Sequence, residues 1–163
     1  MQITFKEYDD SFFYDLKKCM EELQDYIVSV DSLKRNRRLP KFGISYTKNI
    51  IKKVKKNNGL IILVYIKEKI AGCIVGLLEN QPKSELLEYI PEKGARVEEL
   101  IILKEFRGLG LGEKLMKKME YFFKGKECTS IRIKVFEPNN KARIFYKKLG
   151  YNERVIDLFK IIK

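Results

Sequence analysis

The stretch LIILKEFRGLGLGEKLMKKMEYFF, from Leu100 to Phe123, passes from an apolar run through three alternating glycines into a lysine-rich amphipathic segment. This order predicts a buried strand, a tight turn and a helix. Glycine permits a positive φ and leaves no Cβ above the backbone, and the free amides of a helix's first turn attract anions. The stretch therefore favours a phosphate-binding turn, although a tight connection without a ligand would use the same residue types.

The rest of the chain changes between strand-like and helix-like periodicity, without repeats or linkers. Helices are predicted at residues 10–30, 44–57, 111–123 and 142–149, and residues 80–94 form an excursion with one helical turn. Strands are predicted at residues 2–8, 60–66, 70–78, 96–103, 130–136 and 154–162. Helices alternate with strands only in the second half. The pattern therefore predicts one mixed α/β domain over residues 1–163, not a uniformly doubly wound one.

The composition limits the possible chemistry. The absence of histidine excludes imidazole-based catalytic triads and HExxH metal sites. Cys19, Cys73 and Cys128 are widely spaced and form no CxxC pair, which predicts free thiols in a reducing compartment. The longest apolar run, residues 60–66, is far shorter than the roughly 20 residues of a membrane span. With no signal-peptide pattern at the start, we expect a cytoplasmic protein without a metal or a membrane partner.

The net charge of +12, from 34 basic and 22 acidic residues, is compatible with a polyanionic ligand or with a solvated lysine-rich surface. Ten of the basic residues lie between residues 31 and 58. We find no zinc finger, no RNA-binding sheet signature and no interleaved aromatic and basic residues. A nucleic-acid partner is therefore not expected.

Two motifs give the glycine turn a more specific meaning. The spacing Arg-x-x-Gly-x-Gly follows a predicted strand and opens a helix, whereas the dinucleotide fingerprint GxGxxG fails at Glu113. The later segment NNKARIFYKKLGY, residues 139–151, supplies Asn139, Ala142, Phe145, Tyr146, Gly150 and Tyr151. In this order, the two motifs resemble the acyl-CoA loop and the second signature of the GNAT superfamily of N-acetyltransferases. The resemblance is close over residues 95–151 and rests only on element order over residues 1–94.

This resemblance implies a fold and a co-substrate. The fold would be a mostly antiparallel twisted sheet with a splayed strand pair, flanked by about four helices. Acetyl-CoA would bind a core of about residues 95–151, and the acceptor would meet elements within about residues 1–94. The strand would bind the pantetheine arm, the Ile102 N–H would face the thioester oxygen, and the turn would bind the pyrophosphate. The residues implied in cofactor binding are Leu100, Ile101, Ile102, Arg107, Gly108, Leu109, Gly110, Leu111, Gly112, Glu113 and Asn139.

The implied reaction is direct transfer of an acetyl group to a primary amine in a ternary complex. Tyr146 matches the general acid that many family members use, although an aromatic residue would also pack at this helix position. Strand alternation would put Glu98 on the face of Leu100, and Glu99 on the opposite face, which makes Glu98 the candidate base. The sequence leaves open whether Glu98 or water takes the proton.

The acceptor is not fixed by these residues. A small-molecule amine or a peptide is expected, and protein N-terminal or lysine acetylation is the alternative. A glutamate that the family's ribosomal-protein acetyltransferases use corresponds here to Lys134, which weakens the N-terminal alternative. A catalytically idle acyl-CoA sensor is a further alternative, from a different functional class. The resemblance also suggests a homodimer.

Overall fold

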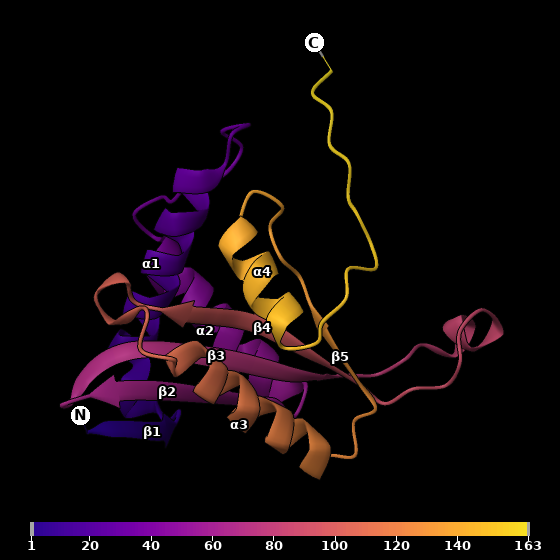
Figure 1. The fold of residues 1–163 in the computed structure, drawn as a ribbon, viewed down its shortest axis with the longest axis horizontal. Helices are drawn as coiled ribbons and strands as arrows, with labels where there is room; N and C mark the ends of the chain where they lie inside the picture. Colours follow the sequence, from indigo (N-terminus) through magenta and orange to yellow (C-terminus); the bar gives the residue numbers. More distant parts are fainter. Residues whose placement is uncertain (1, 163) are drawn as a thin grey trace.

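A five-stranded sheet lies between two layers of helices in the computed structural model, which describes residues 2–162 (Figure 1). The strands are β1 (Ile3–Glu7), β2 (Leu60–Ile66), β3 (Lys69–Glu79), β4 (Gly94–Ile102) and β5 (Ser130–Ile133). They follow one another in the sheet in chain order, and only the last pair, β4 and β5, is parallel. The predicted class, a mixed α/β fold with a mostly antiparallel sheet, is therefore confirmed.

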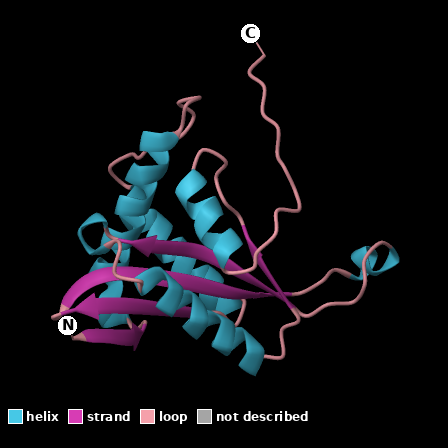
Figure 2. Ribbon diagram, in the orientation of Figure 1, coloured by secondary structure: helices cyan, strands magenta, loops and turns pink. Residues whose placement is uncertain are grey.

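Four helices cover the sheet (Figure 2). They are α1 (Phe13–Val30), α2 (Phe42–Lys56), α3 (Leu111–Gly125) and α4 (Asn140–Lys148), with short 3-10 turns at Asp10–Phe12, Lys83–Leu87 and Lys104–Phe106. The four helices that periodicity predicted are thus present, with ends shifted by a few residues. The excursion after β3 also carries its single helical turn.

Alternation along the strands divides the core into two clusters. Ile61, Leu63 and Tyr65 of β2 pack toward α1 and α2, whereas Ile62 and Val64 pack toward α3. Because successive strand residues point to opposite faces, an apolar run such as residues 60–66 must be covered on both sides. The two helical layers provide that cover.

Close packing of α3 on β3 requires a glycine in the sheet. A Cβ added to Gly76 would lie 2.2 Å from Met119 Sδ and 2.7 Å from Phe123 Cζ. Both of these α3 side chains are fully buried. The glycine therefore sets how closely the helix approaches the sheet, and with it the position of the turn that precedes α3.

Two strand predictions are wrong. β5 ends at Ile133 and not at residue 136, because β4 and β5 stop pairing after Val97 and Ile133. Residues 154–162 form no strand; this segment leaves the domain as an extended tail (Figure 1). A strand pattern produces a strand only where another strand supplies hydrogen-bond partners, and this segment meets none within its own chain.

The alternation expected within β4 is also wrong. Val75 of β3 faces Glu99 whereas the next residue, Gly76, faces Val97, so Glu98 is an extra residue in β4. Such a β-bulge places two residues opposite one and re-aims their side chains. Both Glu98 and Glu99 contact α2 as a result, so Glu98 does not share the face of Leu100 and Ile102.

Candidate active site

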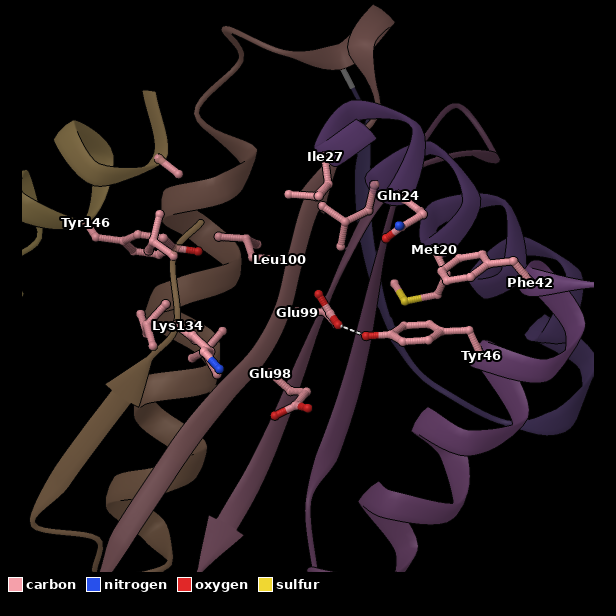
Figure 3. Close-up of a pocket in the computed structure, with 15 residues that line it drawn as sticks. Met20, Gln24, Ile27, Phe42, Tyr46, Glu98, Glu99, Leu100, Lys134 and Tyr146 are labelled. Carbon is pink, nitrogen blue, oxygen red and sulfur yellow. Dashed lines mark hydrogen bonds between the residues drawn. The ribbon is translucent and has the colours of Figure 1, made fainter. Parts of the chain in front are cut away.

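A cavity of about 200 Å³ opens where β4 and β5 part (Figure 3). The two strands pair from Gly94 and Ser130 as far as Val97 and Ile133, and diverge beyond that point. The cavity has walls from α1, α2, β4, the end of β5 and α4. The splayed parallel pair thus creates an opening between the last two strands of the sheet that side chains only partly fill.

The main chain of β4 presents free hydrogen-bonding groups to this opening. The Leu103 N–H donates to the Ala71 carbonyl at 2.9 Å, and the register pairs Ile101 with Cys73 and Ile102 with Gly72. Antiparallel ladders alternate, so the N–H groups of Ile101 and Leu103 point to β3, while those of Leu100 and Ile102 point toward the splay. The main-chain contact expected of Ile101 is therefore directed into the sheet instead.

The turn after β4 has the positive φ angles that its glycines predicted. Gly108 and Gly110 have φ values of +82° and +70°, in the left-handed region that favours glycine. Gly110 precedes α3 without a side-chain cap, and the Lys114 N–H donates to its carbonyl. The amides of residues 111–113 therefore emerge at the positive end of α3.

The third glycine, Gly112, serves helix packing. A Cβ at Gly112 would meet Phe145 Cζ of α4 at 3.4 Å. Leu111 is buried, whereas Leu109 and Glu113 are exposed, and Glu113 pairs with Lys117 at 2.7 Å. Of the residues predicted to touch the cofactor, Leu111 thus has its side chain in the core and Gly112 has none, so both offer only main-chain groups to a ligand.

Tyr26 of α1 links the two sequence motifs. Its hydroxyl donates to Asn139 Oδ1 at 3.1 Å, and the Arg107 guanidinium lies 5.3 Å from the centre of its ring. Arg107 Nε also donates to the Ile102 carbonyl at 2.9 Å. Asn139 Oδ1 caps α4 by accepting the Ala142 N–H at 3.2 Å. Arg107 and Asn139 therefore both contact Tyr26, a link that the sequence did not reveal.

Glu99 is a partly buried carboxylate in the cavity wall. The Tyr46 hydroxyl of α2 donates a hydrogen bond to Glu99 Oε1 (Figure 3). Burial raises the pKa of Glu99 to about 7; the hydrogen bond from Tyr46 opposes this rise, and the charge of Glu98 adds to it. A carboxyl group with this pKa exchanges its proton near neutral pH, as a general base must.

Glu98 has a different environment. It pairs with Lys53 of α2, and its side chain is 18% exposed. Sequence reasoning missed Glu99 because the bulge cannot be seen in a linear pattern. The available signal was a pair of adjacent glutamates inside an apolar strand.

Tyr146 approaches the cavity from α4, on the side away from α2 (Figure 3). Burial raises the pKa of its phenol above the usual range, and the charge of Glu99 adds to this rise. The phenol therefore keeps its proton at neutral pH. It also packs edge-on against Phe145 and Tyr151, with ring centroids 5.1 and 5.9 Å away. The structure thus brings Tyr146, Glu99 and Glu98 together around one cavity.

The sequence profile of the acetyltransferase (GNAT) family matches residues 7–151, most of the chain. The chain belongs to the GNAT family. Its splayed β4–β5 pair and its glycine turn lie within the matched segment. Members of this family use acetyl-CoA as the acetyl donor.

Two curated relatives resemble part of this GNAT domain. An uncharacterized N-acetyltransferase of Methanocaldococcus jannaschii is 43% identical over 56 residues, which is 34% of the chain and 36% of the relative. The thialysine N-epsilon-acetyltransferase of Bos taurus is 34% identical over 64 residues, 38% of each chain. The chain thus matches little more than a third of the length of these relatives.

Solved structures match nearly the whole GNAT chain. A tetramutant of the BH1408 protein from Bacillus halodurans has a TM-score of 0.84 at 17% identity, covering 98% of this chain and 99% of that one. AAC(6')-Iy, in complex with the bisubstrate analog CoA-S-monomethyl-acetylneamine, has a TM-score of 0.71 at 11% identity, covering 99% and 100%. These similarities establish the fold.

Within residues 2–162, no three metal-ligating side chains are grouped so that they could hold an ion. No helix in the described part of the chain has the length and apolar character that crossing a bilayer demands.

Proposed function

We propose that this GNAT domain transfers the acetyl group of acetyl-CoA to a primary amine by direct attack in a ternary complex. The observation that carries the proposal is the partly buried Glu99 carboxylate, with a pKa of about 7, in the same cavity as the protonated phenol of Tyr146. A base and an acid with such different affinities for protons suit a reaction that removes one proton and supplies another.

The turn and the strand supply a cradle of main-chain groups for the co-substrate. The N–H groups that emerge from the first turn of α3, behind two left-handed glycines, suit a pyrophosphate. The outward N–H groups of Leu100 and Ile102 suit the amide groups of a pantetheine arm. In this arrangement the Ile102 N–H stabilises negative charge on the thioester oxygen.

Two side chains handle the protons of this proposed reaction, one as a base and one as an acid. An alkylammonium keeps its proton up to about pH 10, by analogy with lysine, so Glu99 accepts one proton from the acceptor. The neutral amine then attacks the thioester carbon, and the tetrahedral intermediate collapses with cleavage of the C–S bond. Tyr146 donates its proton to the departing thiolate, and the second proton that the attacking nitrogen loses on forming the amide restores the phenol of Tyr146. Glu98 as the base remains the earlier prediction; burial and hydrogen bonding favour Glu99.

The lining of the cavity supports an acceptor whose reacting end is an aliphatic amine. Met20, Ile27 and Phe42 supply apolar surface, and Glu99 supplies negative charge for the incoming cation, while Lys134 is the one basic side chain in the lining. None of the ten basic side chains between residues 31 and 58 lines this cavity. Lys53 only neutralises Glu98. We therefore propose a small-molecule amine or a flexible peptide side chain as the acceptor. The free cysteines fit a cytoplasmic location.

The proposal is tested by thiol release from acetyl-CoA with a panel of amines, amino acids, aminoglycosides, polyamines and peptides. The Glu99→Gln variant should lose most of the activity, while Glu98→Gln should keep more of it. Binding of CoA is measured separately by calorimetry, with Gly110→Glu as the disrupting variant and Gly125→Glu as the matched control. Binding that survives in Gly110→Glu would disprove the cradle. Normal CoA binding without thiol release for any amine would indicate an acyl-CoA sensor.

A further inference from the structure

Lys134, the one basic side chain in the lining of the cavity, has no counter-ion in the domain. It follows Ile133, the last residue of β5 that pairs with β4, so it lies where the two strands part. Its ammonium group forms no ion pair with any residue that the structure describes. A lysine ammonium is a compact positive charge with three hydrogen-bond donors. This position therefore offers both charge and donors to a ligand in the cavity.

Other basic side chains near the site are neutralised by acids of the chain itself. Lys53 of α2 pairs with Glu98, the bulged residue of β4. Arg132, two residues before Lys134 in the chain, pairs with Glu92. Lys134 differs from both because no acidic side chain of the described domain neutralises it. Its charge stays available for an anion that enters from solvent.

The two unlike charges of the cavity lie on different walls (Figure 3). Lys134 belongs to the wall that the end of β5 forms, and Glu99 belongs to the wall where β4 meets α2 and accepts the hydrogen bond from Tyr46. Apolar side chains such as Leu23 and Leu100 complete the lining. A molecule with an amine at one end and an anion at the other is complementary to this arrangement, because each end meets the opposite charge.

The size of the cavity and the charge of Lys134 both limit the class of acceptor. The cavity volume of about 200 Å³ is below the range of about 300–1,000 Å³ typical of pockets that enclose drug-sized ligands. A compact acceptor fits such a volume better than an aminoglycoside does. An acceptor with a second ammonium group would bring that charge toward Lys134, and like charges at short range repel. Lys134 would thus act against polyamines as well as in favour of anions.

We propose that the acceptor is a small amine that also carries a carboxylate or a phosphate, and that Lys134 binds this anionic group. This inference rests on the proposed function, since it names the class of acceptor for the same site. Glu99 takes the proton of the amine, and Lys134 has no part in the proton transfers. Lys134 is therefore a residue that determines specificity, because its contact with the anion orients the amine toward Glu99.

Pairs of acceptors that differ in the anionic group are the first test. Thiol release from acetyl-CoA is measured for β-alanine against β-alaninamide, ε-aminocaproate against its amide, and phosphoethanolamine against ethanolamine. We expect the anionic member of at least one pair to have a kcat/KM at least about tenfold higher, the usual size of a charge-assisted hydrogen bond. The carboxylate and phosphate pairs show which anion is accepted.

Two outcomes of this screen have different meanings. If neutral amines or polyamines are acetylated and no anionic member is preferred in any pair, the inference is wrong while the proposed function stands. If no amine of any kind causes thiol release, the proposed function fails and this inference fails with it.

Variants of Lys134 give the second test. Lys134→Gln removes the charge but keeps most of the length of the side chain. Its KM for the preferred anionic acceptor should rise roughly tenfold, with kcat and CoA affinity close to those of wild type. Lys134→Glu should reverse the preference, in favour of the diamine cadaverine. The matched control is Lys124→Gln, which changes an exposed lysine in the last turn of α3 and should alter neither constant. An unchanged KM in Lys134→Gln, or a loss of CoA binding measured by calorimetry, would refute the assignment of Lys134 to the acceptor.

Discussion

Glu99 occupies a position where burial and one hydrogen bond act on the same carboxyl group in opposite directions. Burial raises its pKa to about 7 even though Tyr46 donates to it. Below this pH the group is protonated and cannot accept a proton from an amine. We therefore expect kcat at saturating substrates to rise with pH through about 7 and then to level off.

The matched comparison is a pH–rate profile of Glu99→Gln. This variant keeps the size of the side chain and a hydrogen-bond acceptor for Tyr46, but cannot take up a proton. Its kcat should be lower and should lack the rise near neutral pH, retaining only the dependence that comes from the amine itself. An unchanged rise in the variant would assign that pKa to another group.

The same carboxyl group should affect stability. Its pKa is raised from 4.5 in the unfolded chain to about 7 in the folded one, so the folded state binds the proton more tightly. Its favourable contribution is complete below pH 4.5 and disappears as pH rises to about 7. Glu99→Gln should therefore be more stable than wild type at pH 8, by about 3 kcal/mol at 1.36 kcal/mol per pKa unit. Urea unfolding at pH 4 and pH 8 measures this, and equal differences at both pH values would contradict it.

Tyr146 can be tested without disturbing its packing. Tyr146→Phe keeps the ring beside Phe145 and Tyr151 but removes the acidic hydroxyl. We expect kcat to fall by roughly a hundredfold or more, as for loss of a general acid, with little change in CoA affinity. Steady-state kinetics and calorimetry measure the two effects, and Tyr121→Phe, on the exposed side of α3, is the control. If Tyr146→Phe kept the kcat of wild type, Tyr146 would not be the general acid and would serve only in packing.

At the scale of elements, the packing of α3 on β3 depends on Gly76, which has no Cβ. In Gly76→Ala, the new Cβ would overlap Met119 and Phe123, which are buried and cannot move into solvent. We expect a loss of stability of about 1–3 kcal/mol, typical of overpacking. Gly125→Ala, in the last turn of α3 with no atom within 4 Å, should be neutral or slightly stabilising. Thermal or urea unfolding of both variants checks this, and equal effects would exclude overpacking.

The sequence allowed most elements to be predicted, because their patterns are local. An amphipathic period of 3.6 or an alternation of two reflects burial of one face, and α3 and β2 follow this rule. The predictions that failed concern features that depend on a neighbouring strand. The bulge at Glu98 depends on the register with β3, and the strand pattern of residues 154–162 has no partner in the same chain. The two motifs were enough to predict the glycine turn and Tyr146. The position of Glu99 in the cavity was not predicted, because simple alternation takes no account of the bulge.

At the scale of the whole molecule, the net charge of +12 makes the folded chain repel itself. Moderate salt screens this repulsion, since the Debye length falls from about 30 Å at 0.01 M to about 10 Å at 0.1 M. The melting temperature at pH 7 should therefore rise when potassium chloride is increased over this range. Differential scanning calorimetry measures it, with sucrose as an uncharged control. A fall in melting temperature would mean that the surface ion pairs outweigh the net repulsion.

The contacts of Tyr26 have a consequence for how the two halves of the molecule communicate. One phenol from the amino-terminal half touches both the arginine before the glycines and the asparagine that starts the final helix. Tyr26 belongs to α1, whose Met20, Gln24 and Ile27 line the cavity, so a ligand that contacts either of those residues acts next to a side chain of this helix. We therefore propose that binding of the co-substrate at the glycine turn is coupled through the Tyr26 ring to the acceptor side of the cavity.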